Sequence, residues 1–318
     1  METGEICRRQ LKRQQVAEFF ANCEACIVAM EACGSAHYWG RKFTSQGHTV
    51  RLIAAQFVRP FVKSNKTDAA DAQAIWEAAQ RPDMKFVALK TEEQQSVLTL
   101  HRMREQLVKI RTMQINQLRG LLYEFGVDLP QGRQKGMARV TEEVAKLEER
   151  VSILVIDTIR QQIQRIKTLD KDIEGIERKL LLWKKEEKAC QKLMNIPGVG
   201  LLSATAAVAT MGDAKTFKSG REFASFLGLV PRQSGTGGRV KLLGISKRGD
   251  VYLRSLLIHG ARSVIQHQRK NSPWLEKLLL RRPHNVVAVA LANKMARTIW
   301  ALLAHDRTFE KDYAASAA

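Results

Sequence analysis

Cys26-Ile-Val-Ala-Met-Glu31 and Thr49-Val-Arg-Leu-Ile53 decide the fold of the first part of this 318-residue chain. Both are short runs of apolar and β-branched residues, which is typical of strands. Between them, residues 37–45 suit a helix that stops before Gly47. Strands that alternate with helices form a largely parallel sheet. Residues 1–90 are therefore predicted to be an α/β domain.

The rest of this first domain is expected to follow the same alternation. Residues 6–11 are interpreted as a further strand, although their alternation is poor, and residues 16–20 as a short helix. A second helix is expected to start near Asp68, and residues 85–89 are expected to return to the sheet.

Residues 91–190 change to long helices. In the first run, apolar residues recur at steps of three, four and five until residues 128–132 break the pattern. A second run has near-heptad spacing with charged residues between, which leaves a narrow apolar seam. That seam contains Leu147, Val151, Leu154, Ile159, Ile163, Ile166, Ile173, Ile176 and Leu180. Two interpretations stay open, an intramolecular hairpin and a dimerising coiled coil.

Residues 191–318 are predicted to be mainly helical, and they are strongly basic. The whole chain has 52 Lys and Arg against 32 Asp and Glu, a net charge of +20. Between Arg232 and Arg297 only Asp250 and Glu276 oppose fourteen basic residues. A charge of this size favours a polyanionic partner, most simply nucleic acid.

Several classes of protein are excluded by composition. The longest uncharged stretch, 193–212, contains Pro197 and several glycines, so no membrane partner is expected. Residues 1–15 lack the apolar segment of a signal peptide. Five cysteines are an odd, sparse set typical of a reducing compartment, and Cys23 and Cys26 are interpreted as buried thiols rather than zinc ligands. A cytoplasmic, nucleoid-associated protein is expected.

The first candidate site is a pair of aspartates, Asp68 and Asp71, near the start of a helix. Residues three apart share a helix face, so both carboxylates can reach one metal ion. The alternative is helix capping, in which Asp68 satisfies free amide groups. Glu31, at the end of a strand, favours the metal interpretation. Three carboxylates that converge at the sheet edge would bind Mg²⁺ for phosphodiester chemistry.

The second candidate is Ile196-Pro-Gly-Val-Gly200, which resembles a helix-hairpin-helix turn. Glycines let backbone amides approach a phosphate closely, so Pro197, Gly198 and Gly200 are candidates for nucleic-acid binding. The alternative is a tight turn between two packed helices.

The third candidate is Ser234, in the glycine-rich segment 231–241. A serine flanked by cations can attack phosphorus, and Arg232, Arg239 and Lys241 would hold the phosphate. The alternative is a flexible basic loop that only binds the nucleic-acid backbone. Three further cations are candidate contacts: Lys66, Lys247 and Arg248. Core packing is the default expectation for the five tryptophans.

Four of these stretches resemble, in the same order, bacterial insertion-sequence transposases of the DEDD type. They are Met30-Glu31-Ala-Cys-Gly-Ser-Ala-His-Tyr-Trp39, Lys63-Ser-Asn-Lys-Thr-Asp68-Ala-Ala-Asp71, Ile196-Pro-Gly-Val-Gly200 and Gly244-Ile-Ser-Lys-Arg-Gly249. The resemblance implies a RuvC-like, RNase H-type domain at 1–90, a coiled-coil dimerisation segment at 91–190 and a DNA-binding transposase domain at 191–318. It also implies DNA as substrate, Mg²⁺ or Mn²⁺, a structured guide RNA, and a homo-oligomer, either a dimer or a tetramer.

Carried over by motif, Glu31, Asp68 and Asp71 match the second to fourth acidic residues of that family, and Ser234 matches its nucleophile. Ser246 is the serine to test beside it. The family's first aspartate lies on an opening strand that nothing here matches, so this chain is expected to begin after that strand. Two other functions stay open: a junction-cleaving nuclease that uses water, and an inactive remnant that only binds nucleic acid.

Overall fold

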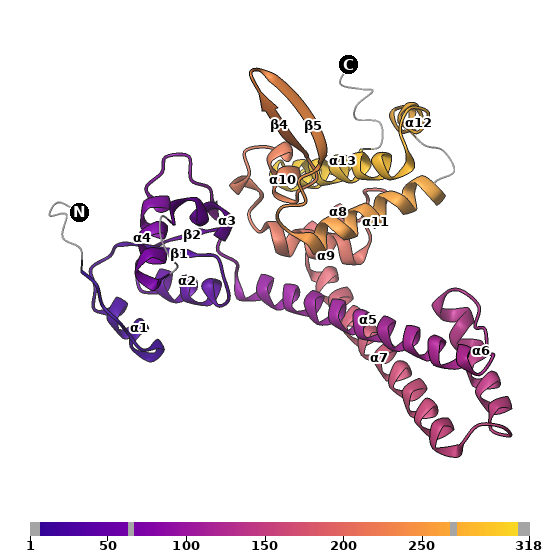
Figure 1. Cartoon of the computed structure of the whole chain (residues 1–318). Helices are drawn as coiled ribbons and strands as arrows, with labels where there is room; N and C mark the ends of the chain where they lie inside the picture. The colour runs from indigo at the N-terminus through magenta and orange to yellow at the C-terminus, as the bar shows by residue number, and fades with distance from the viewer. Residues whose placement is uncertain (1–6, 63–66, 268–271, 311–318) are drawn as a thin grey trace. The chain divides into compact units, whose positions relative to one another are not determined.

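The computed structural model describes residues 7–62, 67–267 and 272–310 (Figure 1). The chain divides into two compact units, Met1–Glu92 and Glu93–Ala318. Across the described residues the fold is a mostly helical α/β arrangement with two small sheets.

The first unit is a small sheet covered by helices. Its elements are α1 (Arg13–Ala21), β1 (Ile27–Glu31), α2 (Ala36–Ser45), β2 (Thr49–Ile53), α3 (Ala55–Val58), the 3₁₀ turn η1 (Arg59–Phe61), α4 (Asp68–Ala79) and β3 (Phe86–Val87). The strand order is β1-β2-β3, with β1 parallel and β3 antiparallel to β2. The predicted sheet is therefore parallel in its longer pair only.

Two predictions in this unit are corrected. Residues 7–12 form no strand, because their Lys and Arg side chains leave no apolar face to bury, and Ile6 lies outside the described residues. The expected return to the sheet at 85–89 shortens to the two residues of β3.

A long helical arm opens the second unit. It consists of α5 (Glu92–Glu124), α6 (Arg133–Leu147) and α7 (Ile153–Glu186). Helices α5 and α7 run antiparallel, as the pairs Arg104–Glu177 and Arg111–Asp170 show (Figure 1). Leu118, Leu122, Val140, Val144, Ile156, Ile159, Ile163 and Ile166 share one buried cluster of the arm. Much of the predicted seam is thus filled within the chain.

The second apolar run is not one helix. It breaks at residues 148–152, between α6 and α7, so its register changes there. Leu154, which the heptad spacing places in the seam, is 77% exposed.

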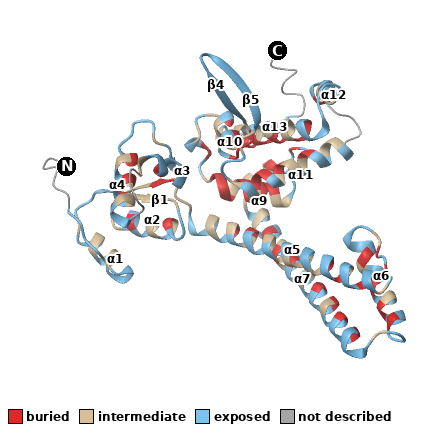
Figure 2. Cartoon of the chain, in the orientation of Figure 1, coloured by how far each residue is buried: buried red, intermediate tan, exposed pale blue. Residues whose placement is uncertain are grey.

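The remainder of the second unit packs around its last helix. Its elements are α8 (Lys188–Leu193), α9 (Leu201–Met211), η2 (Ala214–Thr216), α10 (Gly220–Phe226), β4 (Pro231–Thr236), β5 (Arg239–Ile245), α11 (Val251–His267), α12 (Pro273–Leu279) and α13 (His284–Ala304). Helix α13 has the length and the apolar composition of a membrane-spanning helix, judged by these two properties alone. Its buried stripe, including Ala292, Met295, Ala296 and Ile299, belongs to the core that α9 and α11 complete (Figure 2).

Candidate active site and nucleic-acid interface

Asp68 and Asp71 occupy the first turns of α4, as the sequence predicts. The capping role falls to Thr67, whose hydroxyl accepts a hydrogen bond from the Ala70 amide at 3.2 Å. Neither aspartate side chain makes a hydrogen bond or an ion pair within the described residues. Capping by Asp68 therefore does not account for this pair.

Packing places the two aspartates beside the sheet. Ala74 and Ala78 of α4 are buried in one cluster with Ile53 of β2 and Ala29 of β1. Asp71 precedes Ala74 by three residues, so it continues the sheet-facing stripe of α4 and is half-buried. Alternate residues of a strand share a face, so Glu31 lies on the same face of β1 as Ala29.

The chemistry of this set fits a hard divalent cation, because Mg²⁺ and Mn²⁺ prefer carboxylate oxygens. Glu31, Asp68 and Asp71 belong to two elements in contact, β1 and α4. Across the part of the chain that the structure describes, no three His, Cys, Asp or Glu side chains are gathered closely enough to hold a metal ion. Lys66, the basic candidate before α4, lies outside the described residues.

The cysteines differ from expectation in their exposure. Cys190 is buried, and burial raises the pKa of its thiol to about 12. Of the two thiols predicted to be buried, Cys23 is only half-buried and Cys26 is exposed, since it precedes β1. Its backbone amide donates to Nδ1 of the buried His48 at 3.3 Å, and Nε2 of His48 lies 2.8 Å from the Phe20 carbonyl. These contacts join α1 to the sheet.

The turn at residues 196–200 connects α8 and α9. Gly198 has φ +82°, and a Cβ there would lie 2.7 Å from the carbonyl oxygen of Gly260 in α11. The turn thus packs backbone to backbone on α11, which supports the tight-turn interpretation. Pro197 and Gly200 are exposed, so that surface of the turn is also accessible to a ligand.

Ser234 lies on a β-hairpin, and not in the flexible loop that the alternative interpretation expected. Strands β4 and β5 are antiparallel, and Gly237 and Gly238 turn the chain with φ of +55° and +78°. A two-residue turn with both φ positive matches the strand twist and requires glycines. The Gly-Gly pair beside β-branched residues was the sequence signal for this hairpin.

One face of the hairpin combines a hydroxyl with cations. Ser234 pairs directly with Lys241, and Thr236 with Arg239, so these four side chains share a face. The whole hairpin except Ile245 is exposed (Figure 2). Within the described residues the Ser234 hydroxyl has no hydrogen-bond partner.

Ser246 occupies a different environment, at the base of the hairpin. Its hydroxyl accepts a hydrogen bond from the Arg248 amide at 3.5 Å, and its own amide donates to the Val230 carbonyl. The buried Arg254 donates to the carbonyls of Leu227 and Arg248 at 2.8 and 2.9 Å. Ser246 is therefore engaged in the loop, whereas the Ser234 hydroxyl is exposed to solvent.

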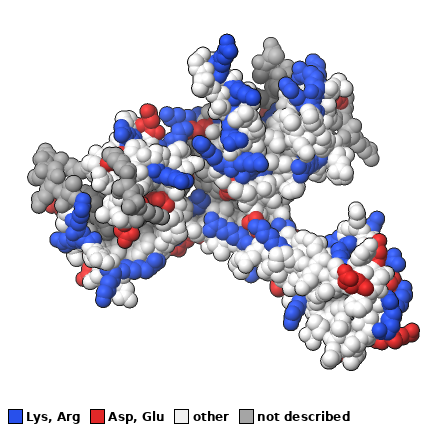
Figure 3. Space-filling view, in the orientation of Figure 1, with Lys and Arg blue, Asp and Glu red and all other residues white. Residues whose placement is uncertain are grey.

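Lys and Arg dominate the face of this unit that Figure 3 shows around the hairpin and α12, while the end of the helical arm mixes both signs. Lys247 and Arg248 are exposed beside the hairpin base. A basic surface of this kind is typical of proteins that bind a polyanion such as nucleic acid.

Comparison with known proteins gives that class its identity. Residues 190–277 match the model described as "Transposase IS116/IS110/IS902 family", and residues 7–126 match a DEDD transposase model of the same group. The second range contains Glu31, Asp68 and Asp71, and the first contains Ser234.

Full-length relatives agree with these matches. A probable family 20 transposase of Pseudomonas aeruginosa is 49% identical over 96% of this chain and 91% of its own length. The transposase for insertion sequence element IS1328 of Yersinia enterocolitica is 42% identical over 96% and 92%. That for IS1111A of Coxiella burnetii is 43% identical over 96% and 85%.

The chain therefore belongs to the IS116/IS110/IS902 family of insertion-sequence transposases, enzymes that cleave and transfer DNA.

Proposed function

We propose that this transposase cuts and rejoins DNA with Ser234 as its nucleophile. The observation that carries the proposal is an exposed, unengaged hydroxyl directly opposite Lys241 on the β4–β5 hairpin. In the proposed step, the Ser234 Oγ attacks a phosphodiester phosphorus and forms an Oγ–P bond. The P–O bond to the leaving sugar oxygen breaks, that oxygen gains a proton, and the serine proton passes to solvent. Rejoining reverses these bond changes with a second sugar hydroxyl.

The cations around Ser234 suit this chemistry. Lys241 neighbours the serine across the strand pair, and Arg232 and Arg239 lie on the same two strands. Fixed positive charges stabilise the negative charge that develops on the phosphoryl oxygens, and they are most effective where they need no rearrangement.

We further propose that Glu31, Asp68 and Asp71 hold Mg²⁺ or Mn²⁺ in a RuvC-like domain. The support is the packing of α4 on β1, which places all three carboxylates on neighbouring elements. A bound divalent ion would neutralise phosphate charge and stabilise a leaving oxygen. The carboxylates themselves hold and orient the ion.

The resemblance also supports a structured guide RNA, a homo-oligomer that joins through the helical arm, and action on DNA in the bacterial cytoplasm. Pro197, Gly198 and Gly200 in a helix-hairpin-helix-like turn, together with Lys66, Lys247 and Arg248, are proposed as nucleic-acid contacts. Leu154 and Tyr123, exposed on the arm, are apolar surface available to a second copy.

The test is to trap a covalent protein–DNA adduct. Nucleic acid that copurifies with the protein is sequenced to identify the substrate and any guide. Labelled substrate is then incubated with protein and Mg²⁺ and separated under denaturing conditions. Ser234→Ala should abolish the adduct, Ser246→Ala should retain it, and Asp71→Asn should lower strand transfer by at least about a hundredfold.

Two results would reject this assignment. Cleavage by Ser234→Ala without an adduct would indicate a nuclease that uses water. An adduct lost only in Ser246→Ala would move the nucleophile to the hairpin base.

A further inference from the structure

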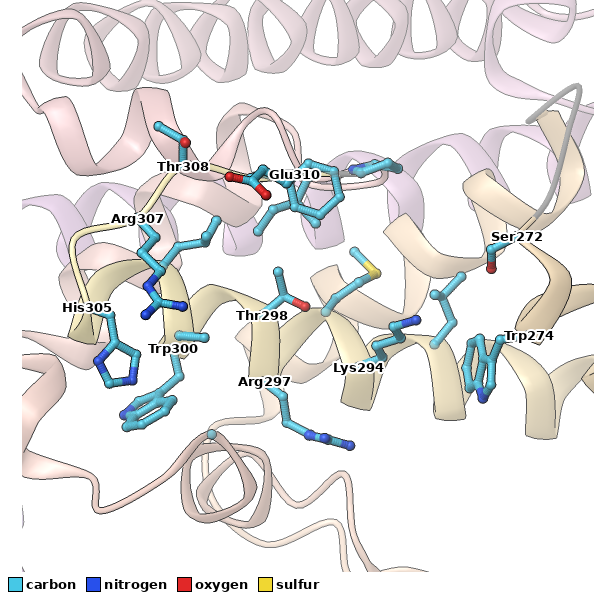
Figure 4. A pocket seen from close by; sticks show the side chains of 18 of the residues that line it. Ser272, Trp274, Lys294, Arg297, Thr298, Trp300, His305, Arg307, Thr308 and Glu310 are labelled. Atoms are coloured by element: carbon cyan, nitrogen blue, oxygen red, sulfur yellow. The ribbon is translucent and has the colours of Figure 1, made fainter. Parts of the chain in front are cut away.

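A large pocket in the second unit is separate from the hairpin that carries Ser234. Its volume is about 1500 Å³, and it lies between the start of α10, the start of α12, one face of α13 and residues 305–310 (Figure 4). Because its walls come from several helices of one compact unit, the pocket is part of the fold of that unit.

An exposed aromatic ring stands on one wall. Trp274 of α12 is 40% exposed, which corrects the default expectation of core packing. The Lys294 ammonium lies 4.8 Å from the centroid of its ring, on one face (Figure 4). The indole N–H has no hydrogen-bond partner among the described residues. Trp274 thus offers a ring face and a free donor to a ligand.

Cations line the pocket close to this ring. Lys294 and Arg297 are three residues apart on α13 and therefore share the face that borders the pocket. Arg221 of α10 also lines it, and neither Arg221 nor Arg297 makes an ion pair within the described residues. Asp306 brings negative charge, but it already pairs with Lys192. Glu310 adds a second carboxylate, so the lining holds four cations (Arg221, Lys294, Arg297 and Arg307) against two carboxylates and is positive overall.

The floor of the pocket is rigid and apolar. Trp300 donates its indole N–H to the carbonyls of Ala214 and Phe217 at 3.0 and 3.2 Å, so its ring is held in place. Leu275 and Met295, which also line the pocket, are buried. A flat, largely apolar group with an attached anion would satisfy the floor, the ring and the cations together.

We propose that this pocket binds one unpaired nucleotide, with its base stacked on Trp274 and its phosphate held by Lys294 and Arg297. Stacking on an aromatic ring is how proteins hold unpaired bases without reading a sequence, and cations beside the ring hold the backbone. The inference rests on the proposed function in that it takes nucleic acid as the substrate. Single-stranded DNA and single-stranded RNA share the required chemistry.

The test uses short single-stranded oligonucleotides with one 2-aminopurine, whose fluorescence falls when it stacks on an aromatic ring. The full chain should quench it. Trp274→Leu should abolish the quenching and lower the affinity for the oligonucleotide about tenfold. Trp274→Phe should retain most of the quenching and most of the affinity. Arg297→Gln should weaken binding but leave the quenching of bound oligonucleotide. Tighter binding of the DNA or of the RNA oligonucleotide identifies the source of the nucleotide.

Trp76→Leu is the matched control, because Trp76 is 52% exposed in the other unit and should change neither readout. Equal binding and quenching by Trp274→Leu and the unaltered chain would overturn the proposal, as would failure of the unaltered chain to bind either oligonucleotide. Binding and quenching need no catalysis. If Ser234 were not the nucleophile, the pocket proposal would therefore still stand, and failure of the pocket proposal would leave the role of Ser234 unaffected.

Discussion

His101 is a buried side chain that joins the helical arm to the C-terminal core. Thr205 donates its hydroxyl proton to the Leu201 carbonyl, so its oxygen accepts from Nε2–H of His101 at 3.0 Å. The Tyr252 hydroxyl then donates to Nδ1 at 3.0 Å. The imidazole is therefore neutral. Burial, assisted by the charge of Arg104, lowers the pKa of His101 to about 4.

This lowered pKa predicts a loss of stability in acid. The folded value lies below the usual 6.5, so the unfolded chain binds more protons as the pH falls from 6.5 toward 4. The free energy of unfolding should drop by roughly 2 kcal/mol between about pH 7 and about pH 5 through this group. Denaturant titrations of the unaltered chain and His101→Gln measure it. An equal pH dependence in both would contradict the prediction.

Arg254 is a second single residue on which local structure depends, because it fixes the two chain segments at the base of the hairpin. Its guanidinium is buried and bridges the carbonyls of Leu227 and Arg248, which lie on opposite sides of the hairpin in sequence. Arg254→Met should lower the free energy of unfolding by roughly 2–4 kcal/mol, because the carbonyls of Leu227 and Arg248, the first of these bonds buried, lose their donor. Thermal or denaturant unfolding measures the change. Arg262→Met, on the same helix but exposed, is the control and should stay within about 0.5 kcal/mol.

At the scale of elements, the turn between α8 and α9 requires a glycine at position 198. Gly198→Ala would place a methyl group 2.8 Å from Cγ2 of Val264, at a residue whose φ is +82°. Both strain and clash should lower the free energy of unfolding by about 2 kcal/mol or more.

Gly200→Ala is the matched control for that turn. A Cβ at Gly200 meets nothing within 4 Å, and its φ is −92°. Unfolding midpoints should therefore change little for Gly200→Ala and clearly for Gly198→Ala. Similar midpoints for the two variants would show that the turn adjusts without cost.

At the scale of the whole molecule, the net charge of +20 predicts salt-dependent binding to DNA. Each cation that neutralises a phosphate releases about one counterion, so affinity falls steeply with salt. Replacing Arg232, Arg239 and Lys241 together by Gln should reduce the slope of log affinity against log salt by about three. Arg139→Gln with Lys146→Gln, a pair of cations that both contact Glu143 on the arm, should leave the slope unchanged. Titrations of labelled duplex DNA measure both slopes.

Exposed apolar surface on the arm predicts self-association. Leu154→Asp should shift the mass measured by light scattering toward the monomer, because a charge would be buried at the interface. Leu280→Asp, at an exposed leucine of the same unit that lies outside the arm, is the control. An unchanged mass for Leu154→Asp would place the interface elsewhere.

The elements that local pattern controls were predictable. Strands β1 and β2, helix α2 and the start of α4 match the sequence predictions within one residue. Each depends on a run of side chains close in sequence and on a nearby stop signal such as Gly47. The carboxylates at Glu31, Asp68 and Asp71 could be proposed for the same reason, because their positions follow from the element ends.

Tertiary structure decided what depends on neighbours distant in the chain. Heptad spacing placed Leu154 in a seam, but the break at 148–152 turned it outward. Packing likewise buried His101, left Trp274 exposed over a pocket, and engaged Ser246 while leaving Ser234 free. Periodicity reports which residues share a face. Whether a face is buried, and which side chains contact it, depends on the elements that pack against it. Only the folded chain determines that.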